Sequence, residues 1–127
     1  MKYTIELNDG VFIGTTFGDA DVENVYKFID GFISHKDWKP GSSFLINHLS
    51  LNASPLNNEH INQIANLFKK RHREIGAGRC AVVVADHLQY GLSRMIISLT
   101  GDKWEGEVDI FTKSIEDALS WIKSGNH

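Results

Sequence analysis

The residues Arg79-Cys80-Ala81-Val82-Val83-Val84-Ala85 form the stretch that decides the fold of this chain. From Ala81 to Ala85 no polar side chain occurs, and three of the five residues are valines. β-branched residues favour strands, and a strand without alternating polar residues is typical of a parallel sheet covered on both faces. We therefore predict a strand over residues 79–85, in the middle of its sheet.

Four more strands are predicted around this one. Residues 2–7 and 11–17 are rich in β-branched and aromatic side chains and flank Asn8-Asp9-Gly10. Glycine and Asx residues tolerate the positive φ angles of tight turns, so the two segments predict an antiparallel hairpin. Short apolar runs predict further strands at residues 43–49 and 107–111.

Four segments carry apolar side chains at the three- and four-residue spacing of an amphipathic helix, over residues 19–35, 61–75, 88–99 and 114–122. The second is predicted to be the longest helix. In the third, Gly91 is interpreted as a point of close packing. The apolar stripe of that third helix consists of Leu88, Leu92, Met95, Ile96 and Leu99.

This order of elements predicts an α/β fold with a five-stranded, mostly parallel sheet, an N-terminal antiparallel hairpin and four helices. With 127 residues, of which 42% are hydrophobic, the chain is expected to form one domain over residues 1–127. The formal net charge of −3 indicates no general attraction to nucleic acid or to an anionic membrane. One cysteine, Cys80, favours a reducing compartment, and no apolar run resembles a signal peptide or a membrane span, so we expect a cytoplasmic protein.

Three short motifs add a resemblance to this reading. They are Trp38-Lys39-Pro40-Gly41, Gly76-Ala77-Gly78-Arg79 and Tyr90-Gly91-Leu92-Ser93-Arg94-Met95. With the order of elements, they resemble the STAS domain (sulfate transporter and anti-sigma factor antagonist), which has the SpoIIAA-like fold, and within it a STAS/SEC14-like group of small bacterial proteins. The resemblance implies a regulatory module that binds a protein partner.

In anti-sigma factor antagonists of this fold, a serine or threonine at the start of the second helix is phosphorylated, in a turn of the Asp-Ser-Ser-Gly type. The corresponding stretch here, residues 51–59, lacks that tetrad. Ser54 is its nearest hydroxyl and is the phosphorylation site that the resemblance implies.

Polar side chains gather where the third and fourth strands are expected to end. Ligands of open α/β sheets favour the carboxyl ends of the strands, so a binding site for a small anion such as phosphate or carboxylate is one hypothesis. The alternative is that Asp86 caps a helix, Arg94 pairs with a neighbouring carboxylate and the others are solvated. The candidate residues are Asn47, His48, Asn52, Ser54, Asp86, His87, Tyr90 and Arg94.

Metal and nucleic-acid sites are not favoured. His60 and His72 are twelve residues apart on one predicted helix, about 120° apart around its axis, so they cannot share a metal ion. Cys80 is interpreted as a structural thiol. The basic run at residues 69–73 is interpreted as a solvated helix end. We predict no metal, no cofactor and no nucleic-acid partner.

Large apolar residues of the third predicted helix and of the loop that follows it indicate a protein interface. Trp104 lies in a polar loop, and Met95 and Ile97 make the third helix apolar on more than one face. These three residues predict a homodimer interface. The alternative is that Trp104, like Trp38, packs back onto its own domain.

Three functions follow from these patterns. The first is a non-enzymatic interaction or regulatory module that also binds a small anionic ligand. The second is a small-ligand or lipid carrier of the SEC14-like type, with its phenylalanines lining a cavity rather than filling the core. The third is an enzyme that uses Asp86, His87, Tyr90 and Arg94 as acid, base and anion clamp. The phenylalanines are Phe12, Phe17, Phe28, Phe32, Phe44, Phe68 and Phe111.

Overall fold

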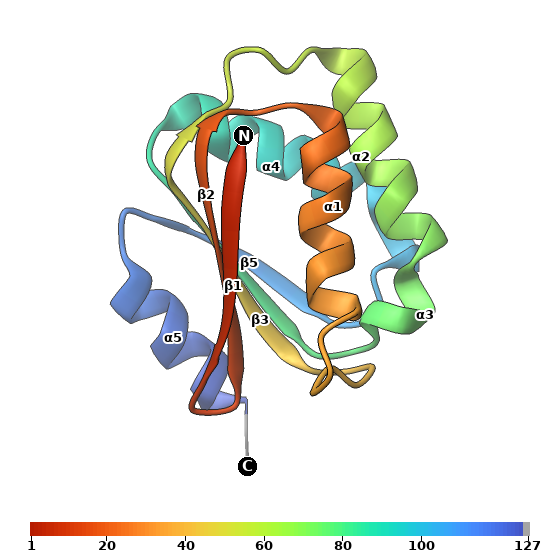
Figure 1. Ribbon diagram of the computed structural model, residues 1–127, viewed down its shortest axis with the longest axis vertical. Coiled ribbons are helices and arrows are strands. Elements are labelled where there is room, and N and C mark those ends of the chain that lie inside the picture. Colours follow the sequence, from red (N-terminus) through yellow and green to blue (C-terminus); the bar gives the residue numbers. More distant parts are fainter. Residues whose placement is uncertain (126–127) are drawn as a thin grey trace.

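A computed structural model describes residues 1–125. It contains one five-stranded sheet in which the strands lie in chain order, β1-β2-β3-β4-β5 (Figure 1). β1 and β2 pair antiparallel, and each later neighbour pairs parallel, as the sequence predicted. The strands are β1 (Lys2–Asn8), β2 (Val11–Asp19), β3 (Ser43–Asn52), β4 (Arg79–Val84) and β5 (Glu107–Thr112).

Two helical layers of unequal size cover the sheet. Because the parallel strands are added in one direction, crossovers of one hand place all their helices on the same face. That face carries the first four helices, and α5 lies alone on the opposite face (Figure 1). The helices are α1 (Val22–Ile33), α2 (Asn58–Lys70), α3 (His72–Ile75), α4 (His87–Thr100) and α5 (Ile115–Ser124).

The alternation of side chains along the strands divides the core between these faces. Phe44, Ile46 and Val82 pack beneath α1, α2 and α4, whereas Leu45 and Val83 pack beneath α5. The strand β4 is buried on both sides, as its valines indicate, although the central strand of the sheet is β3. The prediction that residues 79–85 occupy the middle of the sheet was therefore wrong by one strand.

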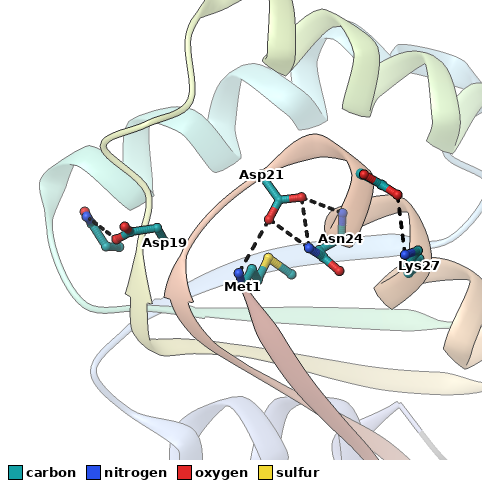
Figure 2. Close-up of polar contacts among 7 residues, drawn as sticks. Met1, Asp19, Asp21, Asn24 and Lys27 are labelled. Carbon is teal, nitrogen blue, oxygen red and sulfur yellow. Dashed lines mark hydrogen bonds and ion pairs between the residues drawn. The ribbon is translucent and has the colours of Figure 1, made fainter.

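Within the described residues, four helices begin after a residue whose side chain accepts a hydrogen bond from a backbone N–H of the first turn. Asp21 caps α1: its carboxylate accepts hydrogen bonds from the backbone N–H and the side-chain amide of Asn24 (Figure 2). The ammonium group of Met1 lies 3.5 Å from the same carboxylate. These hydrogen bonds from Asn24, followed by the charge of the ammonium group, lower the pKa of Asp21. Asn57, Asp86 and Ser114 cap α2, α4 and α5 in the same manner.

Two of the sequence motifs meet at one end of the sheet. The backbone N–H of Gly41 donates to the carbonyl of Ile75, and the indole N–H of Trp38 donates to the carbonyl of Glu74, each over 2.9 Å. A Cβ atom on Gly76 or Gly78 would overlap the backbone of residues 40–42. The Gly-Ala-Gly turn is therefore required by close backbone packing against the Trp-Lys-Pro-Gly segment.

Three predictions about the helices need correction. The segment 61–75 is not one helix, because it is divided at Arg71 into α2 and α3, and the longest helix is α4. Gly91 is not a packing point, since a Cβ atom there would meet nothing within 4 Å. The predicted stripe of α4 is also rotated: Gln89 and Thr100 are its buried residues, whereas Leu88 is 49% exposed.

Candidate functional site

An apolar cavity lies between the sheet and the layer formed by α1, α2 and α4. Its volume is about 90 Å³. Helices, strands β3 to β5 and the loop after α4 all contribute to its wall. The lining residues are Val25, Phe28, Ile29, Ile46, His48, Leu51, Leu56, Ile64, Phe68, Cys80, Val82, Ser93, Ile96, Ile97, Thr100, Trp104 and Val108.

Trp104 closes one side of this cavity. It follows the short 3-10 helix η1 (Gly101–Lys103), and its ring packs against Phe68 and Phe44, with centroids 5.4 and 6.5 Å away. The indole nitrogen is buried and, within residues 1–125, has no hydrogen-bond partner. Next to it, Glu105 Oε2 lies 2.7 Å from His72 Nδ1, a contact that joins this loop to α3.

His48 lines the cavity from the middle of an irregular part of β3. Thr15 pairs with Asn47 and Phe17 pairs with Ser50, so His48 and Leu49 together face the single residue Thr16. The His48 ring contacts the Thr16 hydroxyl over 2.7 Å. Burial lowers the pKa of His48 to about 4, because a charged ring in this position would lack both the hydration it has in water and a compensating anion. The ring is therefore neutral at physiological pH.

Gln89 holds the end of β3 next to the start of α4. The pairing of β3 with β4 begins at Phe44 and ends at Asn47. The backbone N–H and C=O groups of β3 beyond Asn47 therefore need other hydrogen-bond partners on that side. The amide nitrogen of Gln89 donates to the carbonyls of His48 and Leu51 over 3.0 and 2.7 Å, and its oxygen accepts from the backbone N–H of Ala85. Gln89 is 3% exposed.

Gln89 was not among the site residues predicted from the sequence. A signal was present, since Asp86 and Gln89 have the spacing of an N-cap residue and the third residue of a helix. The Asp86 carboxylate does accept a hydrogen bond from the Gln89 backbone N–H. The spacing predicts a local cap, and it gives no indication that the side chain bonds to a strand 38 residues away.

The eight rim candidates do not converge on one site. Asn47 and His48 lie within β3 rather than after it, and the Asn47 side chain accepts from the N–H of Leu49. The Asn52 side chain bonds to Asp19, and Ser54 is exposed in the turn before α2. None of these four residues lines the depressions that the other four candidates border.

The remaining four candidates line two surface depressions beside α4. Asp86, His87 and Tyr90 border one of about 420 Å³ with Thr112 and Lys113. Tyr90 and Arg94 border the other, of about 350 Å³, with Asp109 among its further residues. Asp86 is the N-cap of α4, and its carboxylate accepts a hydrogen bond from the Gln89 N–H. This carboxylate therefore already lies at the helix N-terminus, where a bound anion would have to accept its hydrogen bonds.

The three predicted interface residues have different environments. Met95 is 39% exposed on α4, and Leu88, Tyr90 and Leu99 are exposed on the same helix. In contrast, Ile97 and Trp104 are partly buried and line the cavity. Both tryptophans, Trp38 and Trp104, pack onto their own domain, as the alternative interpretation stated.

Within residues 1–125, no group of three or more histidine, cysteine or acidic side chains is placed to hold a metal ion. The His60 side chain accepts from the N–H of Asn57 as part of the α2 cap. Cys80 lies in the cavity wall, and burial raises the pKa of its thiol. In the part of the chain that the structure describes, no helix is both long enough and apolar enough to cross a membrane.

Comparison with known proteins identifies the fold. The chain is similar to the crystal structure of an uncharacterized protein from the DUF3478 family with a SpoIIAA-like fold, from Shewanella loihica PV-4. The TM-score is 0.61 at 21% sequence identity, over 95% of this chain and 92% of the other. No protein-family profile and no curated protein matches the chain. The fold is therefore SpoIIAA-like, as the resemblance implied.

Proposed function

We propose that this protein is a non-enzymatic interaction module of the STAS type and that α4 carries its recognition surface. The observation behind this proposal is the distribution of exposed apolar side chains. Of the seven large hydrophobic residues that are exposed within residues 1–125, four lie on α4, namely Leu88, Tyr90, Met95 and Leu99. Clustered apolar exposure marks interaction sites more often than scattered residues do.

The spacing on α4 favours a second copy of the chain as the partner. Leu88, Leu92, Met95 and Leu99 follow one another at intervals of four, three and four residues, the pattern of a helix–helix seam. α4 carries one charged side chain, Arg94, so a two-fold pairing of this stripe brings no row of like charges together. A homodimer through α4 therefore buries apolar surface without an electrostatic cost along the seam.

Sedimentation velocity over a wide range of protein concentration tests this proposal. We expect the wild type to sediment as a dimer and Met95→Asp to sediment as a monomer, because a carboxylate in the seam loses its hydration on pairing. Asn66→Asp, at an exposed position of α2, adds the same charge elsewhere and should leave the dimer intact. A monomeric wild type, or a dimeric Met95→Asp variant, contradicts the α4 interface.

A second candidate function is that of a small-ligand carrier, and the interlayer cavity favours it. Protein interiors are close-packed, and a space of about 90 Å³ bounded mainly by apolar side chains is of the kind that holds a small apolar molecule. Of the seven phenylalanines, Phe28 and Phe68 line it. Native mass spectrometry of gently purified protein tests this function, since a carrier is expected to retain additional mass.

An enzyme is the least supported of the three functions. Its proposed acid, base and anion clamp border two depressions, and the Asp86 carboxylate is already used as a helix cap. General acid–base catalysis requires groups within hydrogen-bond reach of one reacting atom. Because these four side chains border two separate depressions, their arrangement does not favour contact of all four with one reacting atom.

A further inference from the structure

One buried side-chain hydrogen-bond donor within residues 1–125 has no acceptor. Among the buried side-chain nitrogen and oxygen atoms of residues 1–125, it is the indole nitrogen of Trp104. A buried N–H that loses water without gaining a partner costs on the order of 1–3 kcal/mol, so such groups are rare in native proteins. The other two indole nitrogens are not in this situation. Trp38 donates its N–H to the carbonyl of Glu74, and the indole nitrogen of Trp121 is not a buried atom without a partner.

Space for an acceptor exists on one side of this ring. Trp104 borders the interlayer cavity of about 90 Å³. It also borders a depression beside Gly76 and Lys103, which has no room for a water molecule. The cavity is therefore the space beside Trp104 in which an acceptor for the N–H group fits.

The chemistry of the cavity wall restricts what that partner is. No lysine, arginine, aspartate or glutamate lines the cavity, and burial keeps the His48 ring neutral above about pH 4. A charged ligand would therefore be buried without a counter-ion, which is strongly unfavourable. The wall cannot replace the hydration of an anion, and the anionic ligand predicted from the rim residues does not fit this space.

A single water molecule, which takes about 30 Å³, would leave most of this cavity empty. Buried waters make two to four hydrogen bonds, typically about three. Besides Trp104, the polar side chains of the wall are His48, Ser93 and Thr100, and the Thr100 hydroxyl already donates its proton to the carbonyl of Ile96 over 2.8 Å; the rest of the wall is apolar. An apolar molecule with one oxygen atom satisfies the indole and fills the remaining space at the same time.

We propose that the interlayer cavity binds a small, uncharged, largely apolar molecule through one acceptor oxygen, a carbonyl or a hydroxyl, that takes a hydrogen bond from Trp104 Nε1. This proposal rests on the carrier function above and names its ligand class. Trp104 provides the polar contact that fixes orientation, and the aliphatic and aromatic wall provides most of the affinity.

Cyclohexanone and methylenecyclohexane are suitable probes, because they have nearly the same shape and only the ketone has an acceptor oxygen. The three tryptophans give three indole N–H signals in a ¹H–¹⁵N correlation spectrum, and Trp104→Phe assigns the signal of Trp104. We expect cyclohexanone to move this signal downfield in a saturable manner and to bind about tenfold more tightly than methylenecyclohexane. Cyclohexanecarboxylate at neutral pH should not bind.

The variants separate the hydrogen bond from the packing. Trp104→Phe retains an aromatic ring and removes the donor, so it should weaken cyclohexanone binding about tenfold and leave methylenecyclohexane unchanged. Trp38→Phe is the matched control, because Trp38 already donates its N–H to the protein and does not line the cavity. It should leave the affinities of both probes unchanged.

The outcomes distinguish this inference from the carrier function itself. Equal affinity of the two probes for the wild type overturns the role of Trp104 and leaves the cavity as a binding site, and this comparison requires no variant. An indole signal that does not move on saturation with cyclohexanone has the same meaning. Absence of binding by both probes overturns the carrier function together with the inference.

Discussion

The side-chain amide of Gln89 donates a hydrogen bond over 2.7 Å to the carbonyl oxygen of Leu51, which joins the first turn of α4 to the end of β3. The same side chain also bonds to the backbone of His48 and Ala85. Strands β3 and β4 pair only as far as Asn47, so Gln89 takes the place of further ladder hydrogen bonds. It also holds in position two residues of the cavity wall, His48 and Leu51.

Replacing Gln89 should therefore destabilise the fold strongly. In Gln89→Leu, three partly buried backbone groups lose their partner, and we expect the free energy of unfolding to fall by about 3 kcal/mol. Urea denaturation measures this loss. Gln63→Leu is the matched control, because the Tyr26 hydroxyl bonds to the backbone carbonyl of Gln63 and not to its side chain. Equal loss in both variants would show that the Gln89 hydrogen bonds contribute little.

Gly91→Ala should stabilise the protein. Gly91 lies inside α4, and an added Cβ atom meets nothing within 4 Å. Alanine is favoured over glycine in a helix by about 1 kcal/mol, which corresponds to a rise in Tm of about 4 °C for a domain of this size. Thermal denaturation followed by circular dichroism measures the shift. Gly14→Ala should have the opposite effect, because its Cβ atom would collide with the rings of Phe28 and Phe32.

The stability of the wild type should decrease as the pH falls from about 6.5 to about 4. His48 has a pKa of about 4 in the folded protein and an ordinary value of 6.5 when unfolded. Between these values the unfolded chain binds the proton and the folded chain does not, so protonation favours unfolding. The expected loss is about 3 kcal/mol over this interval and does not increase below about pH 4 on account of this residue.

Urea denaturation at a series of pH values measures this dependence, and His48→Asn should lack most of it. Asp21 contributes to the pH dependence of stability in a more acidic interval. Its pKa is lowered on folding, so its stabilising contribution is present above pH 3.8, the ordinary value, and is lost as the pH falls through the folded-state pKa. A wild-type slope between pH 6.5 and 4 that persists in His48→Asn would assign the effect to other groups.

Breaking the contact between His72 and Glu105 should loosen the loop that carries Trp104. Their 2.7 Å contact lies at the surface, so Glu105→Ala should change global stability by less than about 1 kcal/mol. Amide hydrogen exchange over residues 101–106 should nevertheless become faster. Glu23→Ala removes another surface pair, that with Lys27, and should leave exchange in this loop unchanged. Unchanged exchange in Glu105→Ala would show that ring packing alone holds the loop.

The sequence predicted the architecture well because the signals for it are local. The valines of β4, the turn at Asn8-Asp9-Gly10 and the cap at Ser114 each reflect the preferences of a few neighbouring residues. The same reasoning failed for α4. Its apolar residues cover much of the helix circumference, so spacing alone could not identify the buried side, which is marked by Gln89 and Thr100.

The candidate site was less predictable than the fold. Asp86, His87 and Tyr90 were expected near one another, and they do border one depression. Asn47 and His48 were expected close to the end of a strand over residues 43–49, whereas β3 continues past them to Asn52. The irregular pairing opposite Thr16 results from how β2 and β3 fit together, and no residue pattern in either strand indicates it.

By itself, the sequence determined the element order, the largely parallel pairing and the single cysteine, because these follow from composition and from interactions between near neighbours. Only the tertiary structure decided which side of α4 is buried, that Gln89 bonds to β3, and that Trp104, which lines a cavity, has a buried indole N–H without an acceptor among the described residues. Those features depend on contacts between residues about 30 to 60 positions apart. Such contacts are set by the packing of whole layers, which local propensities do not specify.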